Sequence, residues 1–97
     1  MSRINRFSEG NRSKLDIMAK TLREVKNPTG ITDILSSCNM NSKQSGYYLE
    51  IMKSSDLIEM NATAGIVRYC RTETGQEFLK AYDKMILLLG PTISNNI

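Results

Sequence analysis

Residues 41–72, NSKQSGYYLEIMKSSDLIEMNATAGIVRYCRT, contain the pattern on which the fold depends. Asn41 is a good helix cap, and Gln44 follows three positions later, as in a capping box. Apolar side chains then recur at helical spacing, at Tyr48, Leu49 and Met52. The sequence therefore predicts a helix over 41–54 that has one apolar stripe and an opposite face that is polar.

A hairpin is predicted directly after this helix. Two short runs rich in β-branched and aromatic residues, over 57–60 and 66–71, have the composition of strands. The link NATAG between them contains Asn61 and Gly65, two residues that tolerate positive φ. A short loop of this kind favours antiparallel pairing of the two runs.

The last helix is predicted over residues 72–89. Thr72 is placed to cap it, and the pair Gly90 and Pro91 is expected to end it. Its apolar positions are Phe78, Leu79, Tyr82, Met85, Ile86 and Leu89. Residues 90–97 are then expected to form a loose tail.

Two more helices are predicted before Asn41. Ser13 is a candidate cap for the first, which must end near residue 26 because Pro28 pushes the residue before it out of the helical region. The run ITDILSSC predicts a second helix of two turns over 31–38. Ser45 and Gly46 are small enough for this helix to cross the next one closely, which gives a helix-turn-helix.

This order predicts an α+β fold that is mostly helical: three helices, a hairpin as a wing, and a fourth helix, which is a winged helix-turn-helix. A chain of 97 residues is sufficient for one domain. We expect that domain over 13–89, between a flexible basic arm at 1–12 and the tail.

The charge pattern favours a polyanionic partner. The net charge is +3, and residues 1–26 carry +4 of it, so the remainder carries −1. Such a basic end is typical of an arm that meets nucleic acid, although a solvated, disordered terminus explains it equally well. The sequence has no apolar run near the roughly 18 residues that a membrane span requires, so we expect a cytoplasmic, nucleoid-associated protein with no membrane partner.

The composition argues against catalysis and against metal binding. The chain has no histidine, and its two cysteines, Cys38 and Cys70, stand far apart at apolar positions. A zinc site needs a cluster of sulfur or nitrogen ligands, and neither a nucleophile with its base nor a phosphate-binding glycine loop is present. We therefore expect two buried reduced thiols, no cofactor, no small-molecule ligand and no enzymatic activity.

The chain resembles the small archaeal winged-helix proteins, which are chromatin-associated, dimeric DNA-binding proteins and proposed transcriptional regulators. The resemblance is carried by KLDIMAKTL at 14–22, by ITDILSSCNMNSKQSGYYLEIMKSSDLIE at 31–59 and by YCRTETGQEFL at 69–79. It implies double-stranded DNA as the partner. Two features depart from the family. Arg71 stands where an aliphatic residue is usual, and the last helix is expected to end at Gly90, which makes it shorter than in the family's coiled-coil dimers. Either the stem of Arg71 packs while its guanidinium reaches solvent, or the base of the wing differs.

Such a fold would place the helix over 41–54 in the major groove. Its outward candidates for DNA contact are Ser42, Lys43, Gln44 and Tyr47. Gln44 can pair with adenine, Lys43 with guanine or a phosphate, and Tyr47 with a phosphate through its hydroxyl. A solvated helix surface is the alternative, and Gln44 also has a competing role in the capping box. Further candidates are Arg68 and Arg71 on the wing and Arg12 and Lys14 near the first helix.

The last helix is apolar around most of its final turns, which favours pairing with a second copy. The candidate dimer interface consists of Phe78, Tyr82, Met85, Ile86 and Leu89. Alternatively, Leu87 and Leu88 fold back on the first helix.

Three functions remain open: a sequence-selective regulator, which the modest charge favours, an architectural chromatin-type DNA binder, and a winged-helix protein–protein module. A redox sensor would have to use Cys38 or Cys70.

Overall fold

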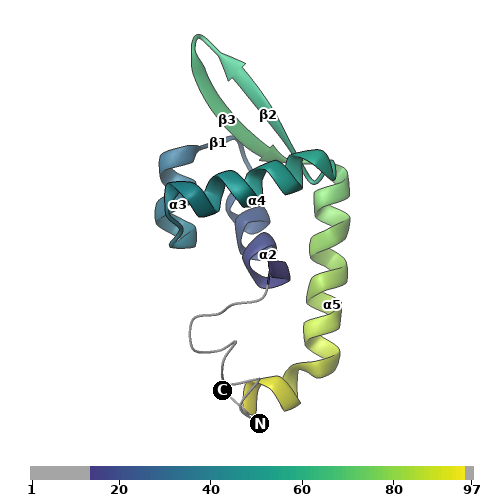
Figure 1. Ribbon diagram of the computed structural model, residues 1–97. Coiled ribbons are helices and arrows are strands. Elements are labelled where there is room, and N and C mark those ends of the chain that lie inside the picture. The colour runs from purple at the N-terminus through teal and green to yellow at the C-terminus, as the bar shows by residue number, and fades with distance from the viewer. Residues whose placement is uncertain (1–13, 96–97) are drawn as a thin grey trace.

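The computed structural model describes residues 14–95, including the side chains of residues 14–89. In chain order the elements are α2 (Lys14–Glu24), β1 (Thr29–Gly30), α3 (Ile31–Cys38), α4 (Ser42–Ser54), β2 (Ile58–Thr63), β3 (Ile66–Arg71) and α5 (Glu73–Asn95). Figure 1 shows the hairpin of β2 and β3, which we call the wing, extending away from the helices at the end opposite to the tip of α5. The predicted arm over 1–12 lies outside the described residues, as does Ser13.

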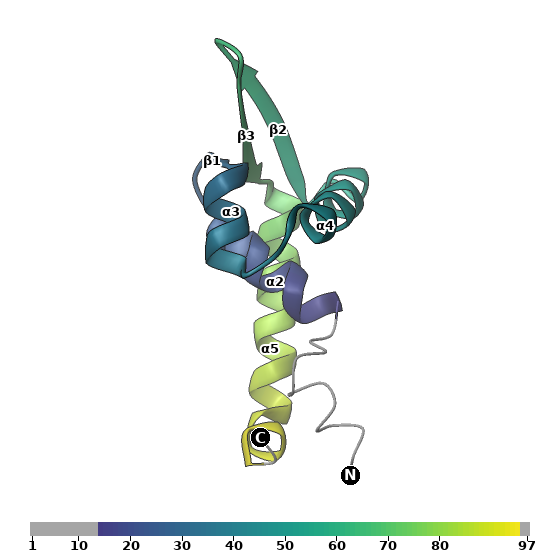
Figure 2. The same cartoon turned by 60° about the vertical axis from the view of Figure 1, so that its left-hand side comes forward.

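The core lies where α2 meets α3, α4 and α5. Figure 2 shows α2 crossing in front of α5, with α3 on one side of it and α4 on the other. The side chains that fill this space include Leu22, Val25, Ile34, Cys38, Met52, Ile58 and Leu79. Cys38 is buried as expected, but Cys70 is only half-buried, and its Sγ lies 3.8 Å from the carbonyl oxygen of Lys26.

The sheet has three strands in the order β1-β3-β2, and both pairings are antiparallel. Ala64 and Gly65 turn the wing with φ angles of 53° and 79°. Both central residues of the turn are therefore left-handed, which matches the twist of a tight hairpin. Asn61, which the sequence offered for positive φ, instead lies within β2, opposite Arg68. The prediction for Asn61 was wrong because β2 continues to Thr63.

The long last helix differs from its prediction. α5 continues to Asn95, so Gly90 and Pro91 do not end it, and residues 90–95 are helical rather than a loose tail. Pro91 has no N–H to donate to the carbonyl group of Leu87, so one hydrogen bond of the helix is missing there. Such a proline can bend a helix without ending it. Accordingly, the final part of α5 turns away from the axis of the rest in Figure 1.

A junction joins the end of α4, the base of the wing and the start of α5. The backbone N–H of Thr72 donates to the carbonyl oxygen of Leu57 over 3.1 Å, and its hydroxyl donates to the carbonyl oxygen of Asp56 over 2.6 Å. The hydroxyl oxygen also accepts from the N–H of Gly75 at 3.0 Å, which confirms Thr72 as the cap of α5. Gly75 is buried, and a Cβ placed there would lie 2.2 Å from the carbonyl oxygen of Leu57.

Gly46, in contrast, is exposed and has no atom within 4 Å of the place where its Cβ would stand. The prediction that α3 crosses closely at Gly46 was therefore wrong, whereas Ser45 is buried as expected. No helix within residues 14–95 has the length and hydropathy needed to span a membrane. In the same part of the chain, no three His, Cys, Asp or Glu residues gather in a way that could hold a metal ion.

Candidate nucleic-acid interface

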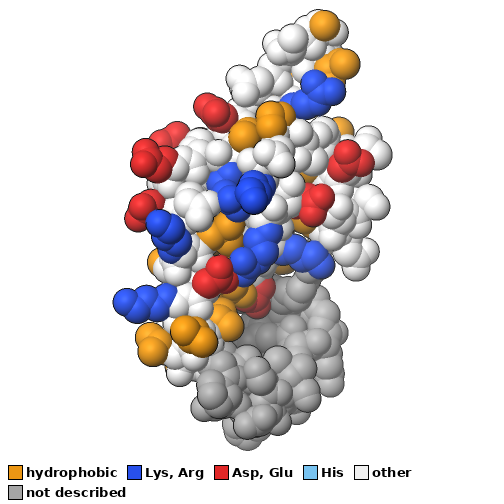
Figure 3. Space-filling view, turned by 180° about the vertical axis from the view of Figure 1, so that it is seen from behind, with side chains coloured by type: hydrophobic (Ala, Val, Ile, Leu, Met, Phe, Trp, Pro, Cys, Tyr) orange, Lys and Arg blue, Asp and Glu red, His pale blue; other side chains and the backbone are white. Residues whose placement is uncertain are grey.

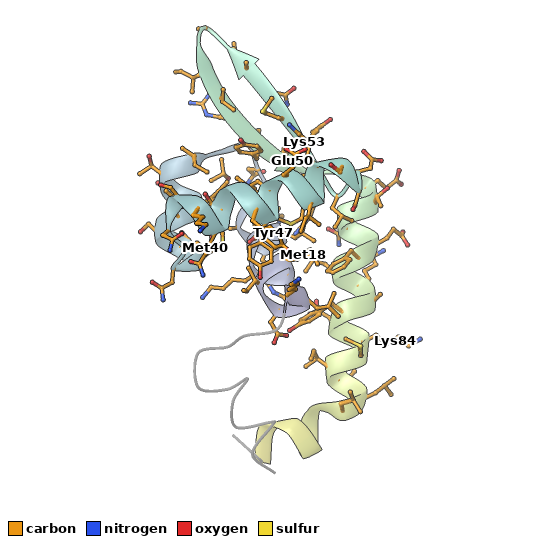
Figure 4. All side chains as sticks on the ribbon, viewed as in Figure 1. Met18, Met40, Tyr47, Glu50, Lys53 and Lys84 are labelled. Carbon is orange, nitrogen blue, oxygen red and sulfur yellow. The ribbon has the colours of Figure 1, made fainter. Side chains whose placement is uncertain are left out.

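One face of α4 is open to solvent along its whole length. Ser45, Tyr48, Leu49 and Met52 are buried, and four exposed side chains follow the opposite side at helical spacing: Lys43, Tyr47, Glu50 and Ser54. Figure 4 shows Tyr47 beside Met18 at the front of the molecule, with Glu50 and Lys53 further along α4 toward the wing. This face is the part of the helix that could enter a DNA groove.

The first turn of α4 is fixed by a complete capping box. The Oδ1 atom of Asn41 accepts from the N–H of Gln44 at 2.8 Å, and the Oε1 atom of Gln44 accepts from the N–H of Asn41 at 3.1 Å. Adenine pairing needs both the oxygen and the nitrogen of the Gln44 amide, and the oxygen is already in use. The capping box therefore holds the Gln44 amide toward Asn41, which competes with adenine pairing, while Ser42 and Lys43 stand exposed beside it.

Lys14 and Tyr47 come together although they lie 33 positions apart in the sequence. The Nζ atom of Lys14 donates to the hydroxyl oxygen of Tyr47 over 3.0 Å and lies 5.4 Å from the centroid of its ring. The Tyr47 ring in turn meets the ring of Tyr48 edge to face, with the centroids 5.0 Å apart. Tyr48 is buried, so this contact fixes Tyr47 on the core although Tyr47 itself is 48% exposed.

The hydrogen bond to Tyr47 raises the pKa of Lys14 above the ordinary lysine value. The ammonium group is therefore fully charged at neutral pH. Near the other end of α4, Glu50 lies 3.7 Å from the Nζ atom of Lys53 and accepts a hydrogen bond of 3.4 Å from Ser54. The first half of the exposed face is thus basic, and its second half carries a paired acid.

A shallow pocket of about 210 Å³ separates α4 from the wing. Its walls are Ile31, Ser45, Gly46, Leu49, Glu50, Lys53 and Tyr69. The register of the wing places Met60 opposite Tyr69 and Ala62 opposite Val67, and directly opposed residues share a face. The wing therefore continues this pocket as an apolar face on which Met60 and Val67 are exposed.

The two wing arginines have different positions. Arg68 is exposed opposite Asn61, on the same face as Ile66 and Thr63. Arg71 is half-buried at the base of the wing, and its Nη1 atom donates to the carbonyl oxygen of Leu22 over 3.1 Å. The structure does not bring Arg71 to the outer surface of the wing, because its guanidinium satisfies a carbonyl group in the last turn of α2 instead. Arg12, the remaining basic candidate, lies outside the described residues.

The predicted interface residues of α5 fall into two groups. Phe78 and Tyr82 pack against the core of their own chain, and the Tyr82 hydroxyl donates to Asp16 of α2. Ile86 is half-buried, whereas Met85 and Leu89 are exposed. Because Phe78 and Tyr82 cover α2, little of their surface remains for a second copy.

Leu87 and Leu88 are 77% and 75% exposed, so they do not fold back on the first helix. The sequence had placed both outside its predicted interface. In Figure 3 apolar side chains gather at the lower left of the view beside the grey residues, and Lys and Arg side chains gather mostly in the middle of the face, with Asp and Glu mainly around them. Among the described side chains of α5, which end at Leu89, the exposed large apolar ones therefore lie at Met85, Leu87, Leu88 and Leu89.

A family model described as winged helix-turn-helix matches residues 11–89. Among solved structures, the chain is similar to Sso10a-2, a DNA-binding protein from Sulfolobus solfataricus, with a TM-score of 0.79 and 20% identity over 88% of this chain and 90% of that one. It is also similar to BpsR of Bordetella bronchiseptica, whose DNA binding is regulated by 6-hydroxynicotinic acid, with a TM-score of 0.67 and 11% identity over 92% of this chain and 62% of that one.

A mutant of MepR from S. aureus gives a TM-score of 0.68 and 10% identity over 96% of this chain and 72% of that one. No curated protein matches the sequence. At these identities the likeness to the solved structures establishes the fold, and it agrees with the predicted arrangement of helices and wing.

Proposed function

Because this chain belongs to the winged helix-turn-helix family, we propose that it is a DNA-binding transcriptional regulator that acts in the cytoplasm on the nucleoid. The observation that carries the proposal is the exposed face of α4, whose first half presents Ser42, Lys43 and the Lys14–Tyr47 pair and contains no acid. Sso10a-2 and BpsR are both described as proteins that bind DNA. The proposal is one of recognition and not of catalysis.

In this function α4 would lie in the major groove, with Lys43 donating to guanine or to a phosphate. The wing would meet the neighbouring minor groove or backbone through Arg68, the exposed arginine of β3. Arg71 is left out of the proposed contact, because its guanidinium donates to the carbonyl oxygen of Leu22.

Fluorescence anisotropy with a labelled random duplex tests the proposal. Binding should weaken strongly between about 50 and about 200 mM salt, because each neutralised phosphate adds about 0.9 to the slope of log K against log salt. Lys43→Met and Arg68→Met should each weaken binding, and Lys80→Met, an exposed lysine on α5, should not. Binding that is absent at low salt, together with no selection from a random duplex pool, would reject the proposal.

We further propose that two copies pair through the C-terminal part of α5. The support is the exposure of Met85, Leu87, Leu88 and Leu89 on one short segment of helix. Sedimentation of the intact protein should show a dimer, and Leu87→Glu combined with Leu88→Glu should give a monomer. Lys84→Glu, an exposed position one turn earlier, is the control and should leave the dimer intact. If the variant with Leu87→Glu and Leu88→Glu is still a dimer, the interface does not lie on this part of α5.

One observation favours a second candidate, a protein–protein module. The wing is poorly charged and exposes Met60, Ile66 and Val67. If the protein captures no DNA, these residues are the place where a protein partner would dock, and Val67→Asp should then abolish complex formation while leaving the fold intact.

An architectural DNA binder differs from a regulator by equal affinity for all duplex sequences.

A further inference from the structure

Lys14 and Tyr47 present a combination of hydrogen-bonding groups that selects a particular kind of ligand. Lys14 donates to the Tyr47 hydroxyl oxygen at 3.0 Å, so the proton of that hydroxyl is directed to another acceptor. An ammonium group has only donors, and two of its N–H groups remain for other partners. The pair therefore offers three donors to solvent within one small region.

A ligand that carries only acceptors fits this arrangement. The non-ester oxygens of a phosphate group are such acceptors and are negatively charged, whereas the acceptors of a guanine edge, N7 and O6, carry no net charge and the adenine edge also contains a donor. Donors 3.0 Å apart are also close enough to reach one phosphate group. On the basis of the DNA-binding function above, we propose that Lys14 and Tyr47 together bind a single backbone phosphate, so that Tyr47 positions α4 and does not read a base.

The pair is held in place before any ligand arrives. The Lys14 ammonium lies over the Tyr47 ring, and that ring is fixed by its edge-to-face contact with the buried Tyr48. The site also joins two elements, because Lys14 begins α2 and Tyr47 is in α4. A phosphate bound here would therefore fix the depth and angle of α4 relative to the DNA strand, which is the role of backbone contacts in general.

A double-mutant cycle tests the shared phosphate. The variants are Lys14→Met, Tyr47→Phe and the two combined, with Lys20→Met as the matched exposed lysine on α2. Their affinities are measured by anisotropy on several duplexes of different sequence and at several salt concentrations. We expect each single change to weaken binding about tenfold on every duplex, because each removes a hydrogen bond to a charged group. Lys14→Met should also lower the salt slope by about 0.9, since it removes one charge contact.

The double variant decides whether the two groups share one phosphate. It should bind about as weakly as the weaker single variant, because loss of either group disrupts the same contact. Losses that multiply would mean two separate contacts and would overturn the proposal, as would a Tyr47→Phe effect confined to one duplex sequence. Tyr47→Phe keeps the ring against Tyr48, so thermal unfolding should be unchanged and a folding defect can be recognised.

The outcome also separates this site from the proposed function. Suppose that the wild-type protein and Lys20→Met bind DNA with a salt dependence. If Lys14→Met and Tyr47→Phe then bind as tightly as the wild-type protein, only the shared phosphate is rejected and the DNA-binding function stands. If the wild-type protein does not bind any duplex, both proposals fail together.

Discussion

The guanidinium of Arg71 donates a hydrogen bond of 3.1 Å to the carbonyl oxygen of Leu22, and this contact ties the base of the wing to the last turn of α2. The backbone strengthens the same connection, since the N–H of Arg71 donates to the carbonyl oxygen of Val25 over 2.8 Å. The carbonyl groups at the end of a helix have no partner within it, so a side chain from elsewhere can satisfy them. Arg71 has this role where relatives are expected to carry an aliphatic residue.

Replacing Arg71 with methionine should lower the free energy of unfolding by about 1–3 kcal/mol, because the carbonyl oxygen of Leu22, a buried residue, loses its donor. The salt slope of DNA binding should stay the same, since Arg71 does not reach the outer surface. Urea unfolding and anisotropy measure the two effects. A smaller salt slope with unchanged stability would instead mean that Arg71 contacts DNA.

Alanine should have opposite effects at Gly75 and Gly46. At Gly75 the new Cβ would meet the carbonyl oxygen of Leu57, so Gly75→Ala should destabilise the protein by about 3 kcal/mol or more. At Gly46 the space is open, and Gly46→Ala should stabilise α4 by about 0.5–1 kcal/mol. Thermal unfolding of both variants checks this, and equal shifts for both would show that the close approach at Gly75 is absent.

A glutamate at position 44 should separate capping from DNA contact. Gln44→Glu keeps an acceptor for the N–H of Asn41, and a negative charge suits the N-terminus of a helix. We expect unchanged or slightly higher stability, combined with weaker DNA binding, because the carboxylate would stand close to the phosphates. If affinity is unaffected, the first turn of α4 lies away from DNA.

Tyr82 should make stability fall at alkaline pH. Burial and the hydrogen bond to Asp16 raise the pKa of Tyr82 to about 12. The unfolded value is about 10, so the neutral form is favoured by folding. Its contribution is therefore complete below about pH 10 and is lost as the pH rises from about 10 to about 12.

Urea unfolding of the wild type and of Tyr82→Phe measures this contribution. The difference in free energy of unfolding between them should be constant at about pH 7–9 and should change above about pH 10. A difference that stays constant up to about pH 12 would show that Tyr82 is not held in its neutral form.

Local signals in the sequence predicted most of the helices and the wing. The capping box depends on residues three positions apart, and Pro28 acts on its immediate neighbours, so both effects are present in any short segment. β1 was missed because two residues, Thr29 and Gly30, form a strand only where β3 is there to pair with them. The continuation of α5 past Pro91 was missed because a proline can either end a helix or bend it.

The candidate site was less predictable, because its contacts join residues that are far apart in the sequence. Lys43 and Tyr47 could be assigned to the exposed face of α4 from periodicity alone. The Lys14–Tyr47 contact joins residues 33 positions apart, and only the packing of α2 against α4 creates it. The inward turn of Arg71 likewise depends on where α2 ends. The exposure of Leu87 and Leu88 could not be predicted because it depends on how far along α5 the cover provided by α2 extends.

The short length of β1 affects how the wing behaves in solution. β1 pairs only with Arg68 and Tyr69, so beyond them the described part of the hairpin has two strands, and the residues over 61–67 are all exposed. An isolated two-stranded ribbon is marginally stable in water, and such segments open locally at low cost. Backbone amides near Ala64 and Gly65 should therefore exchange with deuterium far faster than those of Arg68 and Tyr69. A partner that grips the tip must order it on binding, so slowed amide exchange there would directly report contact with the wing.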